Sequence, residues 1–287
     1  MNKKVAISVA LTGSAGRKSL SPHIPISPQE VAEDAVRCVK AGASMIHLHT
    51  HDYETGAASM ETQLFVDAFE AVKEAMDREN LDVVVNLTTS GGSKDTELRT
   101  AHLKRLRPEI CSYDCGTFNW ALGGIFENSP EFLVEAGKVA MEYDIKPEIE
   151  IFDYGMLANA KAYAQRGLLK TPCHFQFVMG VLGAMDGSVE NLEYLHRHLP
   201  EECTWSVTGI GPAHLPMLLT GLALGADGLR VGLEDNIYLS KGVKATNLQL
   251  VERAVAICRL VGREPANAQE TREMLGITRH SLKEYQG

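Results

Sequence analysis

Short apolar runs alternate with longer amphipathic segments along the whole chain, and the alternation repeats eight times. Most runs are continuous rather than interleaved with polar residues, which is typical of parallel strands covered by helices. We therefore predict eight strands, at residues 5–11, 44–49, 82–88, 110–114, 147–152, 174–178, 204–208 and 228–233.

The segments between these runs contain the start signals of helices. Ser27, Pro28 and Glu30 supply a cap, a proline at the first helical position and the glutamate of a capping box. The apolar residues that follow, between 31 and 39, have the spacing of a helix with one buried face. A last long helix is predicted over residues 248–260.

Eight strand–helix units in roughly 250 residues match a (β/α)8 TIM barrel, an α/β fold. A doubly wound sheet is the alternative, but it usually has fewer units. No linker or break in composition interrupts the chain, so we predict a single domain, 1–287, in which 264–287 form a C-terminal extension. This extension would cover a barrel end or a neighbouring subunit. The chemistry of such barrels lies at the C-terminal ends of the strands.

Composition narrows the partners. The chain of 287 residues is 45% hydrophobic and 23% charged, as is usual for a soluble globular protein. Its net charge of −9 argues against nucleic acid or an anionic membrane as a partner. The 6 cysteines form no C-x-x-C pair, which favours reduced thiols and a cytoplasmic location. No cleavage site follows the apolar run at 5–11, and no run approaches the ~20 apolar residues of a membrane span.

Two histidines, His47 and His49, end the second predicted strand, and His51 follows them. Residues two apart on a strand share a face, so these rings project together at the catalytic end. Imidazole suits zinc, copper, iron and nickel. The pattern predicts a metal site, with a structural or acid–base role as the alternative.

Three charged residues, Arg230, Glu234 and Asp235, lie at the end of the eighth predicted strand. In a closed barrel the eighth and second strands both flank the first, so Glu234 can approach the histidine pair. Two histidines and a glutamate are a common catalytic zinc set. The alternative is an ion-pair network at the barrel end.

Small polar groups follow the third and fourth predicted strands. Thr88, Gly91 and Gly92 can offer hydroxyl and backbone donors to an anion, and Ser112 adds another hydroxyl. Ordinary turns are the alternative. In the fifth predicted strand Glu148 and Glu150 share a face, where they either point into the barrel and need partners or lie outside it in salt bridges.

Together these motifs resemble the β-keto acid cleavage enzyme family, to which the 3-keto-5-aminohexanoate cleavage enzyme belongs. The resemblance runs along nearly the whole chain. Its parts are Leu11-Thr12-Gly13, Ala41-Gly42-Ala43 leading into His47-Leu48-His49, the 88–92 loop, Gly116-Thr117-Phe118-Asn119, Pro147-Glu148-Ile149-Glu150, the 230–236 string and Gly262-Arg263-Glu264-Pro265-Ala266.

The resemblance implies a zinc-dependent barrel that converts a β-keto acid and acetyl-CoA to acetoacetate and an acyl-CoA, commonly as a homotetramer. It makes His47, His49 and Glu234 the zinc ligands and Asp235, held by Arg230, the general base. It assigns the substrate carboxylate to Thr88, Gly91, Gly92 and Ser112, and the far end of the substrate to Glu148.

Two positions depart from the family pattern. Ala15 replaces a glutamate that helps the amino-substrate enzyme hold an ammonium group, which speaks against 3-keto-5-aminohexanoate as the substrate. His51 stands where an arginine commonly precedes Asp52, and it offers a competing metal ligand. The alternative functions are a metal aldolase or lyase that needs no CoA, a facial-triad iron oxygenase and a non-catalytic barrel.

Overall fold

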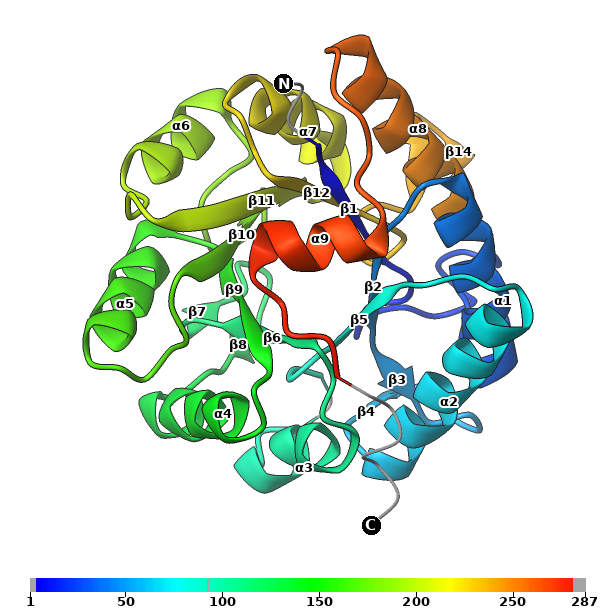
Figure 1. Cartoon of the computed structure of the whole chain (residues 1–287), viewed down its shortest axis with the longest axis horizontal. Coiled ribbons are helices and arrows are strands. Elements are labelled where there is room, and N and C mark those ends of the chain that lie inside the picture. The colour runs from blue at the N-terminus through cyan, green and yellow to red at the C-terminus, as the bar shows by residue number, and fades with distance from the viewer. Residues whose placement is uncertain (1–3, 92, 281–287) are drawn as a thin grey trace.

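The computed structural model describes residues 4–91 and 93–280 and shows a closed barrel of parallel strands (Figure 1). The strand order around the barrel is β1-β12-β11-β10-β9-β6-β5-β2. Their bounds are β1 Ala6–Ala10, β2 Met45–Leu48, β5 Val84–Leu87, β6 Ile110–Asp114, β9 Lys146–Ile151, β10 Cys173–Met179, β11 Cys203–Gly209 and β12 Gly228–Val231. The predicted single-domain TIM barrel is therefore confirmed.

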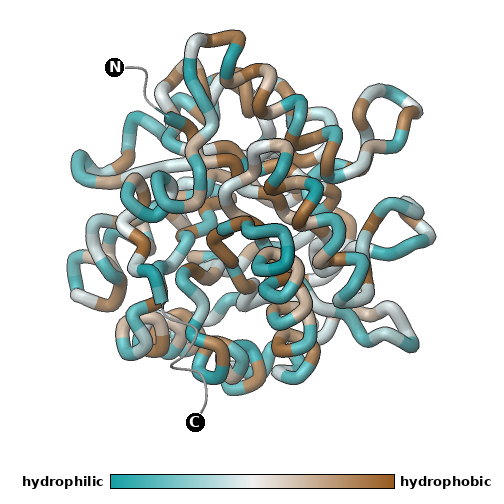
Figure 2. The backbone as a smooth tube through the Cα atoms, turned by 45° about the vertical axis from the view of Figure 1, so that its right-hand side comes forward, coloured by the Kyte–Doolittle hydropathy of each residue, from teal (hydrophilic) through white to brown (hydrophobic). Residues whose placement is uncertain are grey.

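Helices surround the barrel. They are α1 Pro28–Ala41, α2 Thr62–Arg78, α3 Thr96–Leu106, α4 Pro130–Glu142, α5 Tyr154–Gln165, α6 Val189–Arg197, α7 His214–Ala223, preceded by the 3-10 turn Gly211–Ala213, and α8 Asn247–Leu260. The predicted capping box is present, because the Ser27 side chain accepts from the Glu30 backbone while the Glu30 side chain accepts from that of Ser27. Hydrophobic and hydrophilic residues alternate along these helices, as one buried face requires (Figure 2).

Two predicted strands end earlier than the sequence pattern indicates. The eighth ends at Val231, because Gly232 adopts φ 137° and turns the chain where a Cβ would lie 2.1 Å from the Ala10 carbonyl oxygen. Glu234 and Asp235 therefore lie on the loop after β12. The second strand ends at Leu48, which leaves His49 between β2 and β3.

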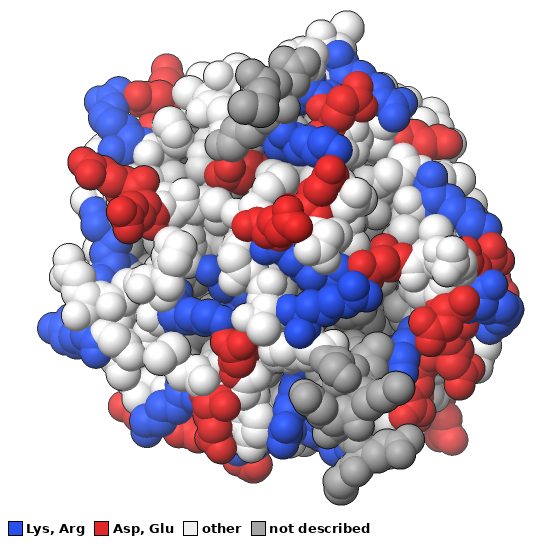
Figure 3. Space-filling view, viewed as in Figure 1, with Lys and Arg blue, Asp and Glu red and all other residues white. Residues whose placement is uncertain are grey.

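The chain after α8 crosses the N-terminal end of the barrel, where α9, Ala268–Leu275, lies over the strand starts (Figure 1). Leu275 and Ile277 pack with Met45 and Val84 from the first residues of β2 and β5. Lysine, arginine and acidic side chains are mixed over this face (Figure 3). Of the predicted extension, residues 281–287 lie outside the described residues.

Three hairpins that the sequence pattern did not predict rise from loops at the opposite end. They are β3 Thr50–His51 with β4 Ala58–Ser59, β7 Phe118–Asn119 with β8 Ile125–Phe126, and β13 Tyr238–Ser240 with β14 Val243–Lys244. They follow β2, β6 and β12, and they form part of the wall around the barrel mouth. Within the described ranges, no helix has the length and apolarity needed to cross a membrane.

Candidate active site and metal centre

Strand β1 brings the histidine pair and Glu234 together. On one side its residue Ala10 is in register with His47, and on the other its carbonyl accepts from the Glu234 backbone N–H at 3.3 Å. The side chains meet above this strand, where His47 Nε2 lies 3.7 Å from Glu234 Oε2 and His49 Nε2 lies 3.4 Å from Glu234 Oε1. The predicted convergence of the second and eighth strand ends is therefore present.

These three side chains fit a divalent cation. One donor atom from each lies within 4.8 Å of the other two. Glu234 Oε2 is buried and accepts no hydrogen bond from any described residue, so an acceptor faces the histidines without a donor. Burial lowers the pKa of His47 to about 3, which keeps its imidazole neutral as a metal ligand must be. The set is typical of catalytic zinc. Within the described chain His51 is not part of this group, although it is buried beside it.

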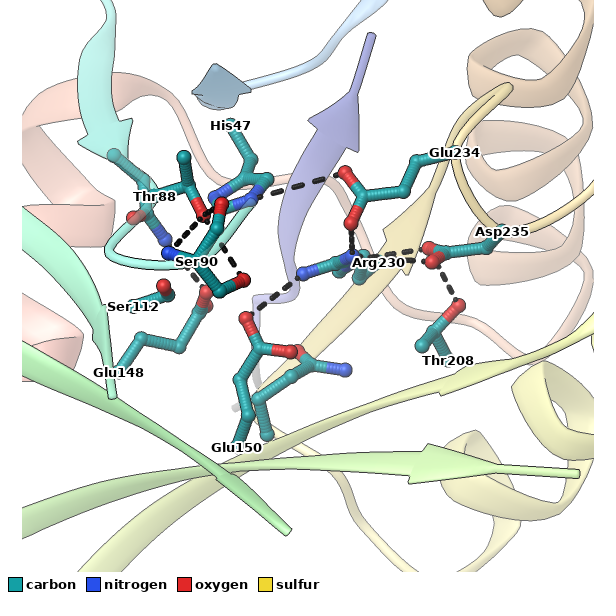
Figure 4. Close-up of polar contacts among 12 residues, drawn as sticks. His47, Thr88, Ser90, Ser112, Glu148, Glu150, Thr208, Arg230, Glu234 and Asp235 are labelled. Carbon is teal, nitrogen blue, oxygen red and sulfur yellow. Dashed lines mark hydrogen bonds and ion pairs between the residues drawn. The ribbon is translucent and has the colours of Figure 1, made fainter. Parts of the chain in front are cut away.

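Arg230 connects the metal group to Asp235 (Figure 4). Its guanidinium binds Asp235 in a bidentate manner, with Nε to Oδ2 at 3.0 Å and Nη2 to Oδ1 at 3.1 Å. The same group lies 2.8 Å from Glu234 Oε1 and 3.1 Å from Glu150 Oε1. The ion-pair network considered for this strand end is thus present together with the metal group, and the two share Glu234.

The buried network sets the charge of each member. Burial alone would raise the pKa of Glu234, but Arg230 and the two histidines hold it well below its ordinary value. Burial raises the pKa of Asp235 against the opposing effect of Arg230. Asp235 also accepts from the Thr208 hydroxyl at 3.0 Å. The result is an ionised Glu234 next to a fixed aspartate of increased basicity.

The loop after β5 is tied together by its own hydroxyls. The Thr88 hydroxyl donates to the Ser90 carbonyl at 3.1 Å and accepts from the Ser90 N–H at 3.0 Å. Ser112 accepts from the Thr89 N–H at 3.0 Å, so it supports this loop from behind. Gly91 adopts φ 124°, and a Cβ there would lie 3.5 Å from His49 Nδ1. Gly92, the other predicted glycine, lies outside the described residues.

Glu148 and Glu150 both point into the barrel, so the interpretation that places them outside it is wrong. Their surroundings differ. Glu150 pairs with Arg230, whereas Glu148 accepts from Asn86 Nδ2 at 2.6 Å. Burial raises the pKa of Glu148 to about 7. Asn86 is in register with His47 on the neighbouring strand, so Glu148 lies behind the metal group.

A cavity of about 360 Å³ opens above these residues. At one end it is lined by the metal group, Thr88, Ser90 and the Arg230–Asp235 pair. The opposite wall is apolar, with Trp120 and Phe126 from the β7–β8 hairpin and Phe152, Val178 and Leu182 from the loops and strands beside it. Ala15 lines the cavity, and Ser112 and Glu148 do not.

The sequence analysis did not single out Asp114 or Thr208. Asp114 lines the cavity, is in register with Glu150, and leaves Oδ2 without a partner in the described chain. Burial raises its pKa. Both residues end predicted strands, so their position at the catalytic end was the available signal. What the sequence does not contain is which of several polar strand ends faces the cavity.

Fold and site together define a (β/α)8-barrel protein with a His-His-Glu metal group beside a buried arginine–aspartate pair. The model of the beta-keto acid cleavage enzyme family matches residues 4–277. The chain therefore belongs to the beta-keto acid cleavage enzyme family, and the predicted resemblance is confirmed.

The curated relatives match over almost their whole length. The chain is 36% identical to the 3-keto-5-aminohexanoate cleavage enzyme of Fusobacterium nucleatum, covering 96% of this chain and 99% of the relative. It is 34% identical to the 3-dehydrocarnitine:acetyl-CoA trimethylamine transferase of Rhizobium meliloti, with 97% and 98% covered. It is 35% identical to the 3-oxoadipate:acetyl-CoA acetyltransferase of Cupriavidus necator, with 96% of each covered.

A solved structure supports the fold. A ternary complex of ObcA with a C4-CoA adduct and oxalate superposes with a TM-score of 0.79 at 23% identity, covering 90% of this chain and 68% of that one. At this identity the likeness concerns the barrel architecture.

Proposed function

We propose that this protein converts a β-keto acid and acetyl-CoA to acetoacetate and an acyl-CoA, with a divalent cation, zinc by preference, held by His47, His49 and Glu234. The observation that supports this most directly is the metal group beside the Arg230–Asp235 pair, in one cavity, in a member of this family. The curated relatives named above share this dependence on β-keto acids or acetyl-CoA in their names.

Asp235 is the proposed general base. A cation in the His-His-Glu group would polarise the substrate's keto group and so acidify the protons on the neighbouring carbon. Asp235 would accept one of these protons. Arg230 and Thr208 fix its carboxylate through three hydrogen bonds, so little orientation is lost in reaching the substrate. Its raised pKa makes it a stronger base than a solvated aspartate.

The loop after β5 is the proposed site for the substrate carboxylate. Thr88 and Gly91 lie beside the histidines, and Gly92 continues the same loop. Ser112 acts through the Thr89 N–H, as a positioning residue for this loop. We assign Glu148 a positioning role as well, because it holds Asn86 next to His47 and does not line the cavity. This replaces the contact with the far end of the substrate that the family resemblance implies.

The proposed compartment is the reducing cytoplasm, which agrees with the free thiols of Cys38, Cys111, Cys115, Cys173, Cys203 and Cys258. A homotetramer is proposed from the family resemblance. Light scattering coupled to size exclusion measures its mass directly.

A panel of β-keto acids that differ beyond the keto carbon, each supplied with acetyl-CoA, tests the function. We expect at least one acid to give acetoacetate and the matching acyl-CoA in equal amounts. Asp235→Asn is expected to lower kcat by about 10²–10⁴-fold, the usual contribution of a general base, while the metal remains bound.

Two results would contradict the proposal. Turnover of a keto acid without any acyl acceptor would favour a CoA-independent aldolase or lyase on the same barrel. Full activity in protein stripped of metal would exclude the metal centre from the reaction. Asp67→Asn, on the outer helix α2, is the matched control for the loss of a carboxylate.

A further inference from the structure

A second and larger cavity, of about 960 Å³, lies beside the active site. It is enclosed by the turn at the start of α7, the loop after β12 and the β13–β14 hairpin. Ile210, Glu234 and Asp235 line both cavities. The second cavity therefore leads directly to the general base, from a side different from the apolar wall described above.

Two buried hydrogen-bond donors in this cavity have no acceptor. Arg253 Nη2 donates to His214 Nδ1 at 3.0 Å. Arginine cannot accept, so Nδ1 of His214 is the acceptor and its proton must be on Nε2. That Nε2, on a side chain only 1% exposed, has no partner in the described chain, and neither does Arg253 Nε. A buried donor without an acceptor is costly, which indicates that a ligand completes the pair.

The remaining surface of the cavity has two characters. Pro212, Leu215, Ile237 and Leu239 give it apolar walls. Lys241 lies at the tip of the hairpin, where its side chain is exposed at the rim. A ligand that matches this surface is long, has an apolar stretch with hydrogen-bond acceptors along it, and ends in an anion.

We propose that this cavity binds the coenzyme A moiety of the acyl donor. The thioester would lie at Asp235, the amide carbonyls of the pantetheine arm would accept from His214 and Arg253, and a phosphate would lie near Lys241. The identity of the ligand rests on the proposed function, because that function requires a CoA thioester at Asp235. The volume is within the range of cofactor sites.

The test measures binding of CoA and of pantetheine, separately, to the metal-loaded protein by calorimetry. Lys241→Ala is expected to weaken CoA about threefold and to leave pantetheine unchanged, because only CoA has phosphates and the lysine is exposed. Arg253→Met is expected to weaken both ligands about tenfold or more, since it removes buried donors. Lys94→Ala, at the mouth after β5, is the matched control and should change neither.

The outcomes separate this inference from the proposed function. If wild-type protein forms acetoacetate while Lys241→Ala and Arg253→Met leave the CoA affinity and the KM for acetyl-CoA unchanged, the inference is wrong and the function stands. If the variants weaken CoA as expected but no β-keto acid is converted, the inference stands and the function is wrong. A change in oligomer mass on Lys241→Ala, at unchanged CoA affinity, would assign the cavity to a subunit contact and overturn the inference. Should Arg253→Met fail to fold, the comparison of CoA and pantetheine in Lys241→Ala still decides.

Discussion

Gly13 and Glu234 lie so close that a Cβ on Gly13 would be 2.5 Å from the Glu234 Cγ. The first strand thus shapes the metal group without contributing a ligand. Any side chain at position 13 must displace the carboxylate that faces His47 and His49.

Gly13→Ala is therefore expected to lower metal affinity at least tenfold, because tight metal sites lose that much when a ligand's support is disturbed. Metal content after dialysis against a weak chelator measures it. Gly56→Ala is the matched control, since Gly56 has a similar φ of 69° but a Cβ there would meet no atom of the described chain within 4 Å. Equal metal loss in both variants would mean that backbone strain, rather than contact with Glu234, is responsible.

Replacing His47 with alanine should remove the bound metal together with acetoacetate formation. The reason is that two remaining ligands cannot hold a catalytic cation firmly. Elemental analysis should show about one metal ion per chain in the wild type and little in His47→Ala. His23→Ala, at an exposed histidine, should retain the full content. A variant that keeps its metal would move the centre elsewhere.

Arg230→Met is expected to lower the free energy of unfolding by about 3–5 kcal/mol, because Glu150 and Asp235 would be left buried without a cation. Arg37→Met should cost less than about 1 kcal/mol, since the Arg37 side chain is 55% exposed in its pair with Asp34. Urea unfolding of the three proteins makes the comparison. Similar losses for both variants would show that the buried network contributes no special stability.

The stability of the fold should fall as the pH rises because of Glu148. Burial raises its folded pKa from 4.5 to about 7, so the folded state keeps a proton that the unfolded state has lost. Its stabilising contribution is complete below about pH 4.5 and is lost as the pH rises to about 7, at no more than about 1.4 kcal/mol per pH unit. Glu148→Gln cannot titrate and should flatten the profile over this window. An unchanged slope in the variant would assign the pH dependence to other groups.

Much of the architecture could be predicted from the sequence because its determinants are local. Apolar runs of strand length and helices with caps such as Ser27 are written into neighbouring residues, and eight repeats of them leave few folds available. The pairing of His47 with His49 follows from the two-residue period of a strand. Even Glu234 could be expected nearby, because barrel closure makes its strand a neighbour of β1.

The tertiary structure decided what identical local patterns cannot. Glu148 and Glu150 have the same spacing and face the same interior, yet one binds Asn86 and the other Arg230. Which partner each finds depends on strand register around the closed barrel, a property of contacts between residues far apart in the chain. The unpaired donors of His214 and Arg253, 39 positions apart, arise in the same way. Sequence periodicity determines which face a side chain is on, and packing alone determines what it meets there.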